Sequence, residues 1–248
     1  GGAGNINRGD ASGIQVGGLG SRNKRFNGIQ VAGALNLNTE SVNGIQVAGL
    51  ANIDIVEAKG LQIAGLLNVT KMLKGVQIGL VNFADSSDGY SIGLININPK
   101  GYHKLSVSTS ELQHLTIGYK SGNGKLYSIM QVGTQLNSKE KAYSVGYGIG
   151  SDKSIGKRFF LNPELTQNYF YTGNSKSQHL LTRLQFNIKY KLATYCYIYT
   201  GPAFSLLYSN NETAADGYRS NFINGYPSVA FSNRIKGWLG WNIGLDLF

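Results

Sequence analysis

The sequence predicts an all-β protein in two parts, a glycine-rich repeat domain that forms a β-solenoid and a small antiparallel β-barrel. Three observations predict this class. A segment that begins Gly-Ile-Gln-Val recurs through residues 1–100, and strands of alternating polarity, rich in tyrosine, follow in residues 101–248. In addition, no run of the sequence reaches the roughly 20 apolar residues that a transmembrane helix needs.

Composition excludes several other classes of protein. Charged residues make up only 15% of the chain and the mean hydropathy is -0.15, a combination that argues against both disorder and helical membrane spans. The 34 glycines come with only 4 prolines, which excludes a collagen-like or proline-rich chain. Cys196 is the single cysteine, so the sequence holds no disulfide within the chain and no cysteine-based metal cluster.

The two parts differ in chemistry. Residues 1–100 contain 18 of the 34 glycines but only three of the 27 aromatic residues, and they carry a net charge of +2 against +8 for residues 101–248. Pro99-Lys100-Gly101 is a cluster of structure-breaking residues between the two compositions. We therefore place the repeat domain at 1–100 and the barrel domain at 101–248.

The repeat domain holds about six copies of one segment. The copies start at Gly13, Gly28, Gly44, Gly60 and Gly75, with a degenerate sixth at Gly89, and the starts are 15, 16, 16, 15 and 14 residues apart. Each copy alternates with period two, which predicts a strand. Isoleucine, valine and leucine occupy one face, and the other face carries Gln15, Gln30, Gln46, Gln62 and Gln77, followed by Asn36, Asn52, Asn68, Asn82 and Asn96.

Two packings fit this period, a parallel β-solenoid with one repeat per coil or a continuous barrel of about 14 strands that includes the repeats. We favour the solenoid, because alternate strands of an up-and-down barrel would put the asparagines of identical copies at opposite ends. The repeats also lack the interfacial aromatic residues of membrane barrels. In the solenoid we expect the aliphatic side chains to stack inward. Glutamine and asparagine ladders follow the axis, and the flat glutamine/alanine face is expected to be a docking surface.

The barrel domain is predicted from long strands with an aromatic face. In residues 180–192, Leu184, Phe186 and Ile188 alternate with polar residues. An alternation of this length suits a strand that crosses lipid and turns its polar face to the lumen. We count about eight strands between residues 103 and 248. The lumen candidates are Glu164, Arg183 and Lys189. If Glu164 lies on a strand next to the row of Arg183 and Lys189, an internal ion pair would partly offset the cost of their burial.

The last strand carries a resemblance to known proteins. The strand resembles the C-terminal strand of bacterial outer-membrane barrels, which the insertion machinery recognises. The resemblance is carried by its apolar face and its terminal residue: Trp241, Ile243, Leu245, Leu247 and Phe248. The repeat Gly-Ile-Gln-Val-Ala-Gly-Leu-x-Asn is similar to that of bacterial surface-repeat proteins. The stretches Gly201–Leu206 and Gly240–Gly244 look like the small barrel-like domain that can follow such repeats. The resemblance implies a place in the cell envelope and brings no catalytic residues with it.

No motif for catalysis, a cofactor or a metal is found. His103, His114 and His179 are scattered, without a carboxylate or cysteine at ligand spacing, and no nucleophile elbow or phosphate loop occurs. The net charge of +10 is expected to meet lipid head groups or lipopolysaccharide phosphates rather than nucleic acid.

These observations lead to one main hypothesis for the function. We expect a non-enzymatic protein of the bacterial outer membrane, an interaction or accessory (plug-like) subunit of a larger outer-membrane complex. Two other classes stay open, an outer-membrane channel formed by a single barrel and a surface adhesin or binding protein.

Overall fold

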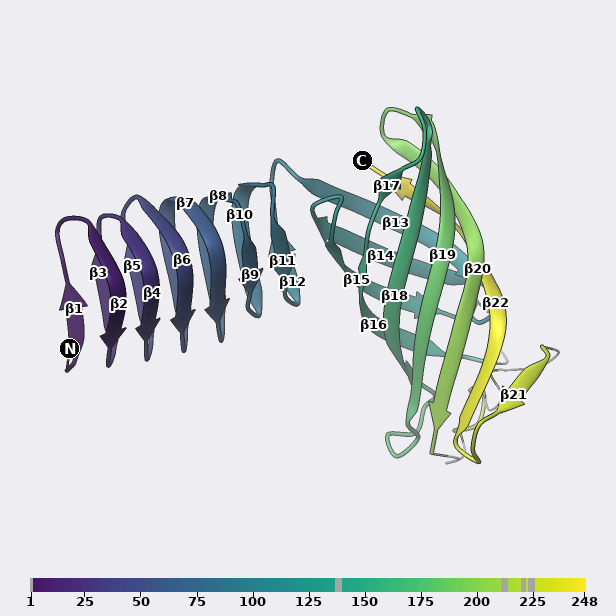
Figure 1. Ribbon diagram of the computed structural model, residues 1–248. Helices are drawn as coiled ribbons and strands as arrows, with labels where there is room; N and C mark the ends of the chain where they lie inside the picture. Colours follow the sequence, from purple (N-terminus) through teal and green to yellow (C-terminus); the bar gives the residue numbers. More distant parts are fainter. Residues whose placement is uncertain (1, 137–139, 211–213, 220–221, 223–225) are drawn as a thin grey trace. The chain divides into compact units, whose positions relative to one another are not determined.

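The computed structural model describes residues 2–136, 140–210, 214–219, 222 and 226–248 (Figure 1). Within these residues the regular structure is β-strand and no helix occurs, so the predicted all-β class is confirmed. The chain divides into two compact units. The first unit is Gly1–His103 together with Ser121–Ser128, and the second is Lys104–Lys120 together with Ile129–Phe248.

The first unit is a parallel coil of short strands, drawn in purple and blue in Figure 1. Its strands are β1 (Gly4–Ile6), β2 (Ala11–Gly17), β3 (Gly20–Asn23), β4 (Phe26–Ala32), β5 (Leu35–Asn38), β6 (Ser41–Ala48), β7 (Ala51–Ala64), β8 (Leu67–Leu73), β9 (Val76–Ile78), β10 (Val81–Ser87), β11 (Tyr90–Ile92) and β12 (Ile95–Ile97).

The repeats stack in exact copy-to-copy register. Gly28 of β4 pairs with Gly44 of β6, which pairs with Gly60 of β7, and the glutamines and asparagines of successive copies pair likewise. All these pairings are parallel. The solenoid is therefore confirmed, and the alternative of a continuous barrel of about 14 strands is wrong, because an antiparallel barrel cannot pair equivalent residues of consecutive copies in parallel.

From the second copy onward, the glycine that starts a copy is required by close backbone packing. Gly44 has φ +136°, and a Cβ at this position would lie 2.0 Å from the carbonyl oxygen of Gly28 in the preceding coil. Gly60 repeats the arrangement with φ +115° and a distance of 2.1 Å to the Gly44 oxygen. A side chain there would meet both a steric clash and an unfavourable φ.

The faces of the coil are reversed relative to the expected ones. Gln30 and Gln46 are 0% exposed, whereas their neighbours Ile29 and Ile45 are 40% and 39% exposed. The predicted inward stacking of isoleucine, valine and leucine is therefore wrong. The interior of the coil is filled by amide side chains that form hydrogen bonds with each other. Along one side the interior also contains a column of buried apolar residues: Phe26, Val42, Ala58, Leu73 and Ala84.

The second unit is a closed antiparallel barrel, as predicted. Eight strands form the wall: β13 (Tyr102–Ser110), β14 (Leu115–Gly122), β15 (Tyr127–Thr134), β16 (Tyr143–Gly150), β18 (Phe159–Tyr171), β19 (His179–Ala193), β20 (Cys196–Ser209) and β22 (Ile235–Leu247). The wall is closed by antiparallel pairing of β13 with β22, which runs from Leu105 opposite Leu247 to Ser110 opposite Asn242. The short β17 (Lys153–Ser154) and β21 (Ser228–Ala230) pair with β18 and β22. Closure leaves the wall without a free edge.

Candidate functional site

The outer surface of the barrel is apolar. On β19, Leu184, Phe186 and Ile188 are 37%, 48% and 45% exposed, while the polar residues between them are buried. The last strand repeats this pattern with Trp241, Ile243 and Leu245 outside, Leu247 half-buried and the terminal Phe248 exposed. A soluble barrel would turn its polar face to water. The apolar outer surface and polar interior of this barrel are the arrangement found in barrels that contact lipid.

The lumen holds charged residues in contact with one another. Lys120 Nζ lies 2.6 Å from Glu164 and 3.2 Å from Asp246, and Lys189 Nζ lies 2.6 Å from Asp246 and 2.8 Å from Asp152. Except for that of Asp152, which is 10% exposed, these side chains are at most 5% exposed. Each buried cation thus faces two carboxylates, which offsets the cost of removing its charge from water.

Another ion pair in the lumen is formed by Arg183. Arg183 Nη2 is 3.0 Å from Oε2 of Glu111, a residue of the turn between β13 and β14. The same carboxylate accepts hydrogen bonds from the indole Nε1 of Trp238 and the backbone N–H of Trp241, each at 3.1 Å. Glu111 therefore joins the β13–β14 turn to β19 and β22 through the barrel interior.

The three predicted lumen residues lie inside the barrel, and each forms an ion pair with a residue that the sequence analysis did not name. Glu164 lies opposite Gln185 in the β18–β19 ladder, and its ion partner is Lys120 of β14. The reason is geometric, because closure brings strands that are distant in the wall to face each other across the lumen. The alternation of β14, with Tyr119 exposed and Lys120 buried, carries a signal for this lysine that the sequence analysis did not use.

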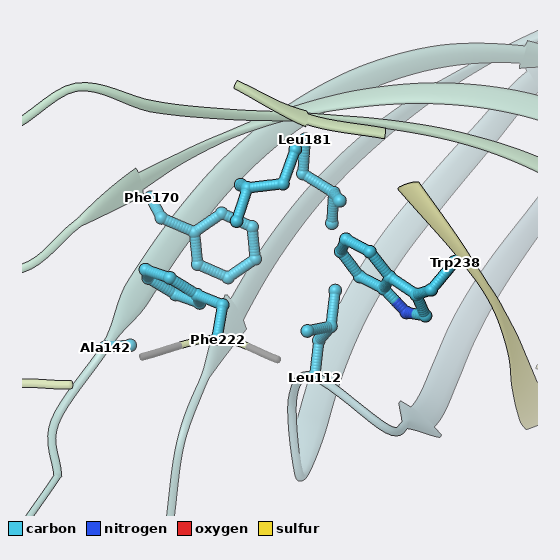
Figure 2. Packing of buried hydrophobic residues seen from close by; sticks show 7 residues of the cluster. Leu112, Ala142, Phe170, Leu181, Phe222 and Trp238 are labelled. Atoms are coloured by element: carbon cyan, nitrogen blue, oxygen red, sulfur yellow. The ribbon is translucent and has the colours of Figure 1, made fainter. Parts of the chain in front are cut away.

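The lumen is closed by its own side chains. At the barrel end that holds the β13–β14 turn, an apolar cluster packs across the interior (Figure 2): Leu112, Ala142, Phe170, Leu181, Leu207, Phe222 and Trp238. Phe222 comes from the segment between β20 and β21, and Arg219 of that segment donates to the carbonyl oxygens of Leu112 and Phe222. The polar region of the lumen contains a cavity of only about 30 Å³, room for one or two water molecules.

Amide ladders fill the interior of the repeats. Each glutamine donates from Nε2 to Oε1 of the glutamine one coil earlier, at 2.8–3.0 Å along the series Gln15, Gln30, Gln46, Gln62 and Gln77. Each asparagine donates from Nδ2 to Oδ1 of the asparagine one coil later, at 2.8–2.9 Å along Asn36, Asn52, Asn68, Asn82 and Asn96. The predicted ladders exist, but the glutamines are internal. Apart from the half-buried Gln15, they are 0–1% exposed. Because hydrogen-bonded partners enclose them, the predicted role of the glutamine face as a docking surface is wrong.

One carboxylate is enclosed by these amides. Asp54 is 0% exposed and occupies a position where the preceding copies have asparagine, Asn23 and Asn38. Its Oδ1 accepts hydrogen bonds from Asn38 Nδ2 at 2.7 Å and Gln46 Nε2 at 3.2 Å, and Oδ2 accepts from Gln62 Nε2. Burial raises the pKa of Asp54 to about 7, and the hydrogen bonds from Asn38 and Gln46 only partly oppose the shift.

Residues that could hold a metal ion are not assembled in the described part of the chain. There, no three residues of the metal-ligating types lie together, and no helix has the length and apolar character needed to cross a bilayer. Cys196 is half-buried at the start of β20. His179 Nε2 lies 2.7 Å from Ser177 Oγ, and both side chains are buried.

Comparison with known proteins adds no family to this description. No protein-family model matches the sequence, and no curated protein matches it.

Proposed function

We propose that this chain is a non-enzymatic protein of the bacterial outer membrane, in which the barrel is a closed anchor for the repeat unit. The observation that carries the proposal is the reversed polarity of the barrel, with aliphatic and aromatic residues outside and the ion pairs of Lys120, Lys189 and Arg183 inside. Burial of charge in the lumen and exposure of leucine and phenylalanine on the wall lower the free energy only if the wall contacts hydrocarbon or protein.

An anchor is supported over a channel by the contents of the lumen. The apolar cluster at one end and the ion pairs around Lys120 leave a cavity of about 30 Å³, too small for a continuous water column. We therefore expect no ion conductance from the protein in a planar bilayer. An accessory role in a larger outer-membrane complex stays part of the proposal, although the glutamine face no longer supports it. A soluble adhesin has no supporting observation here, because it would expose the apolar wall to water.

A matched pair of substitutions tests the membrane contact. Phe186 lies in the middle of β19 and is 48% exposed, whereas Phe231 lies beyond β21 and is 62% exposed. In water, replacing either exposed phenylalanine with lysine would cost little. On a lipid-facing wall Phe186→Lys is expected to destabilise the folded protein by about 2–4 kcal/mol, because the ammonium group lies at mid-membrane depth.

The measurement is urea unfolding of the full chain in phospholipid vesicles, followed by the shift of the folded band on an unheated gel. Phe231→Lys is the control and is expected to fold as the wild type does. Equal behaviour of the two variants would contradict the proposal, as would a wild-type protein that leaves envelopes without detergent and shows no heat-dependent band.

A further inference from the structure

Charge is confined to a recurring part of each repeat. The stretches 13–21, 28–37, 44–53, 60–69, 75–83 and 89–97 contain no aspartate, glutamate, lysine or arginine. All charged residues of the first 100 positions fall in the short segments before, between and after these stretches. Because the copies stack in register, the structure converts this sequence pattern into distinct sides of the solenoid.

One side, here called the charged edge, consists of segments 7–12, 22–27, 38–43, 54–59, 70–74, 84–88 and 98–100. Ion pairs join neighbouring coils along it, for example Lys24 with Glu40 at 3.2 Å and Lys74 with Glu57 at 2.8 Å. With the exception of Asp54, which points into the coil, the charged side chains on this edge reach solvent at least in part. The edge therefore offers both signs of charge to a polar environment.

The opposite side, here called the Gly–Leu edge, is formed by the turns that follow the first strand of each copy. It consists of Gly18-Leu19, Gly33-Ala34, Gly49-Leu50, Gly65-Leu66, Gly79-Leu80 and Gly93-Leu94. Leu50, Leu66 and Leu80 are 52%, 50% and 47% exposed. The two flat faces that lead to this edge are also apolar outside, with Ile45 on one and Leu35 on the other exposed by 39% and 37%.

The uncharged part of a coil has the depth of one membrane leaflet. In the copy that starts at Gly44, the strand runs five residues from Gly44 to Ala48 before the turn. At about 3.3 Å per residue these residues extend about 16 Å. Half of a hydrocarbon core about 30 Å thick is about 15 Å.

From this match we propose that the solenoid itself inserts into one leaflet of the membrane, with its Gly–Leu edge in the hydrocarbon and its charged edge among the lipid head groups. The occupant of the apolar faces is lipid. Lipid surrounds an inserted edge on all sides, whereas a second copy of the chain would cover one flat face and leave the other in water. The mixed charges at the opposite edge complement zwitterionic and anionic head groups.

The interior of the repeats suits this environment. Hydrocarbon offers no hydrogen bonds, so an inserted segment must satisfy its polar groups internally. Inside the ladders the side chains bond to one another, since Gln46 donates to Gln30 and Asn52 donates both to Asn68 and to the carbonyl oxygen of Ile63. The exception is at the start of the asparagine ladder, where the buried Oδ1 of Asn36 accepts no hydrogen bond from the described residues. The parallel pairing between coils does the same for the backbone.

Site-directed spin labelling of the full chain in vesicles tests this placement. In a background with Cys196→Ser, single labels are introduced by Leu66→Cys on the Gly–Leu edge and by Lys71→Cys on the charged edge, two exposed positions of one coil. Collisions with oxygen, which concentrates in hydrocarbon, are compared with collisions with a water-soluble nickel complex. We expect a severalfold higher oxygen-to-nickel ratio at position 66 than at position 71, and Leu50→Cys is expected to behave as Leu66→Cys does.

The other outcomes overturn the proposal in distinguishable ways. Free access of nickel to the labels at 50 and 66 would place the edge in water, and poor access of both reagents would mean that protein, such as a second copy of the chain, covers it. A label from Ile188→Cys on β19 reports on the barrel in the same vesicles. Nickel access at position 188 would refute the proposed anchor, which is a separate failure from that of the solenoid.

Discussion

Asp54 makes the stability of the repeat unit depend on pH with a definite sign. The pKa of Asp54 is about 7 in the folded coil, against 3.8 in the absence of burial. Between these two values the folded state binds a proton that the unfolded state has released. Stability is therefore highest below about pH 4, falls as the pH rises, and is lowest above about pH 7, when both states are ionised.

The size of the effect follows from the shift. A difference of about three pH units corresponds to about 4 kcal/mol of folding free energy. Asp54→Asn keeps the shape of the side chain and one of its two accepting oxygens but removes the charge. The variant is therefore expected to gain stability over the wild type as the pH rises, by about 3 kcal/mol between pH 5 and pH 8, because the slope is about 1.4 kcal/mol per unit until Asp54 ionises.

Urea unfolding of the full chain measures this gain, with pulse proteolysis and fragment masses used to separate the repeat unit from the barrel. The comparison is the difference between the variant and the wild type at each pH, since other carboxylates titrate equally in both. Asp85→Asn is the control, because Asp85 forms a surface ion pair with Lys100 at 2.7 Å, a type of contact worth less than about 1 kcal/mol. Parallel stability curves for wild type and Asp54→Asn from pH 5 to pH 8 would refute the reasoning.

Three further outcomes are expected from other parts of the molecule. Lys120→Met leaves Glu164 and Asp246 facing each other in the lumen and should destabilise the barrel by about 3–5 kcal/mol, read from the fluorescence of the two tryptophans during unfolding; the double variant with Glu164→Gln should recover part of the loss, and no recovery would count against a direct pair. Gly44→Ala should destabilise the repeat unit by well over the roughly 1 kcal/mol of an ordinary glycine-to-alanine change, whereas Gly156→Ala, with open space around its Cβ position, should be neutral in the same urea assay. Wild-type protein in a planar bilayer should show no ion conductance, and stepwise channels would contradict the closed lumen.

Much of the architecture could be predicted because the repeats are nearly identical. Copies that start at Gly28, Gly44 and Gly60 must pair equivalent residues if each is one coil, and the structure pairs them in that way. The alternation of polar and apolar residues along the barrel strands also predicts which side chains point into the lumen, and the structure has Glu164 and Lys189 inside the wall as expected.

The contacts inside the lumen could not be predicted in the same manner. The alternation along each strand indicates that Lys120, Glu164 and Asp246 point inward. Which of these side chains contact one another depends on the stagger of eight strands around a closed wall. Glu111 carried no signal, because it lies in a turn, outside any alternation, and reaches Arg183 only when the barrel is closed. These interactions are properties of the closed tertiary structure.

The reversed faces of the repeats have a different cause. An alternation of isoleucine and glutamine defines two faces of a strand but does not say which of them lies inside, since that choice depends on the surroundings of the folded chain. In water Ile29 would be enclosed and Gln30 exposed, and the structure has the opposite arrangement. The amides can be internal because each finds a partner in the next coil, at a spacing set by the strand separation. The exposed aliphatic faces then lower the free energy only in contact with an apolar medium. The same sign of polarity in the barrel and in the repeats is therefore one physical argument for hydrocarbon around both units, which the labels at positions 66 and 188 examine separately.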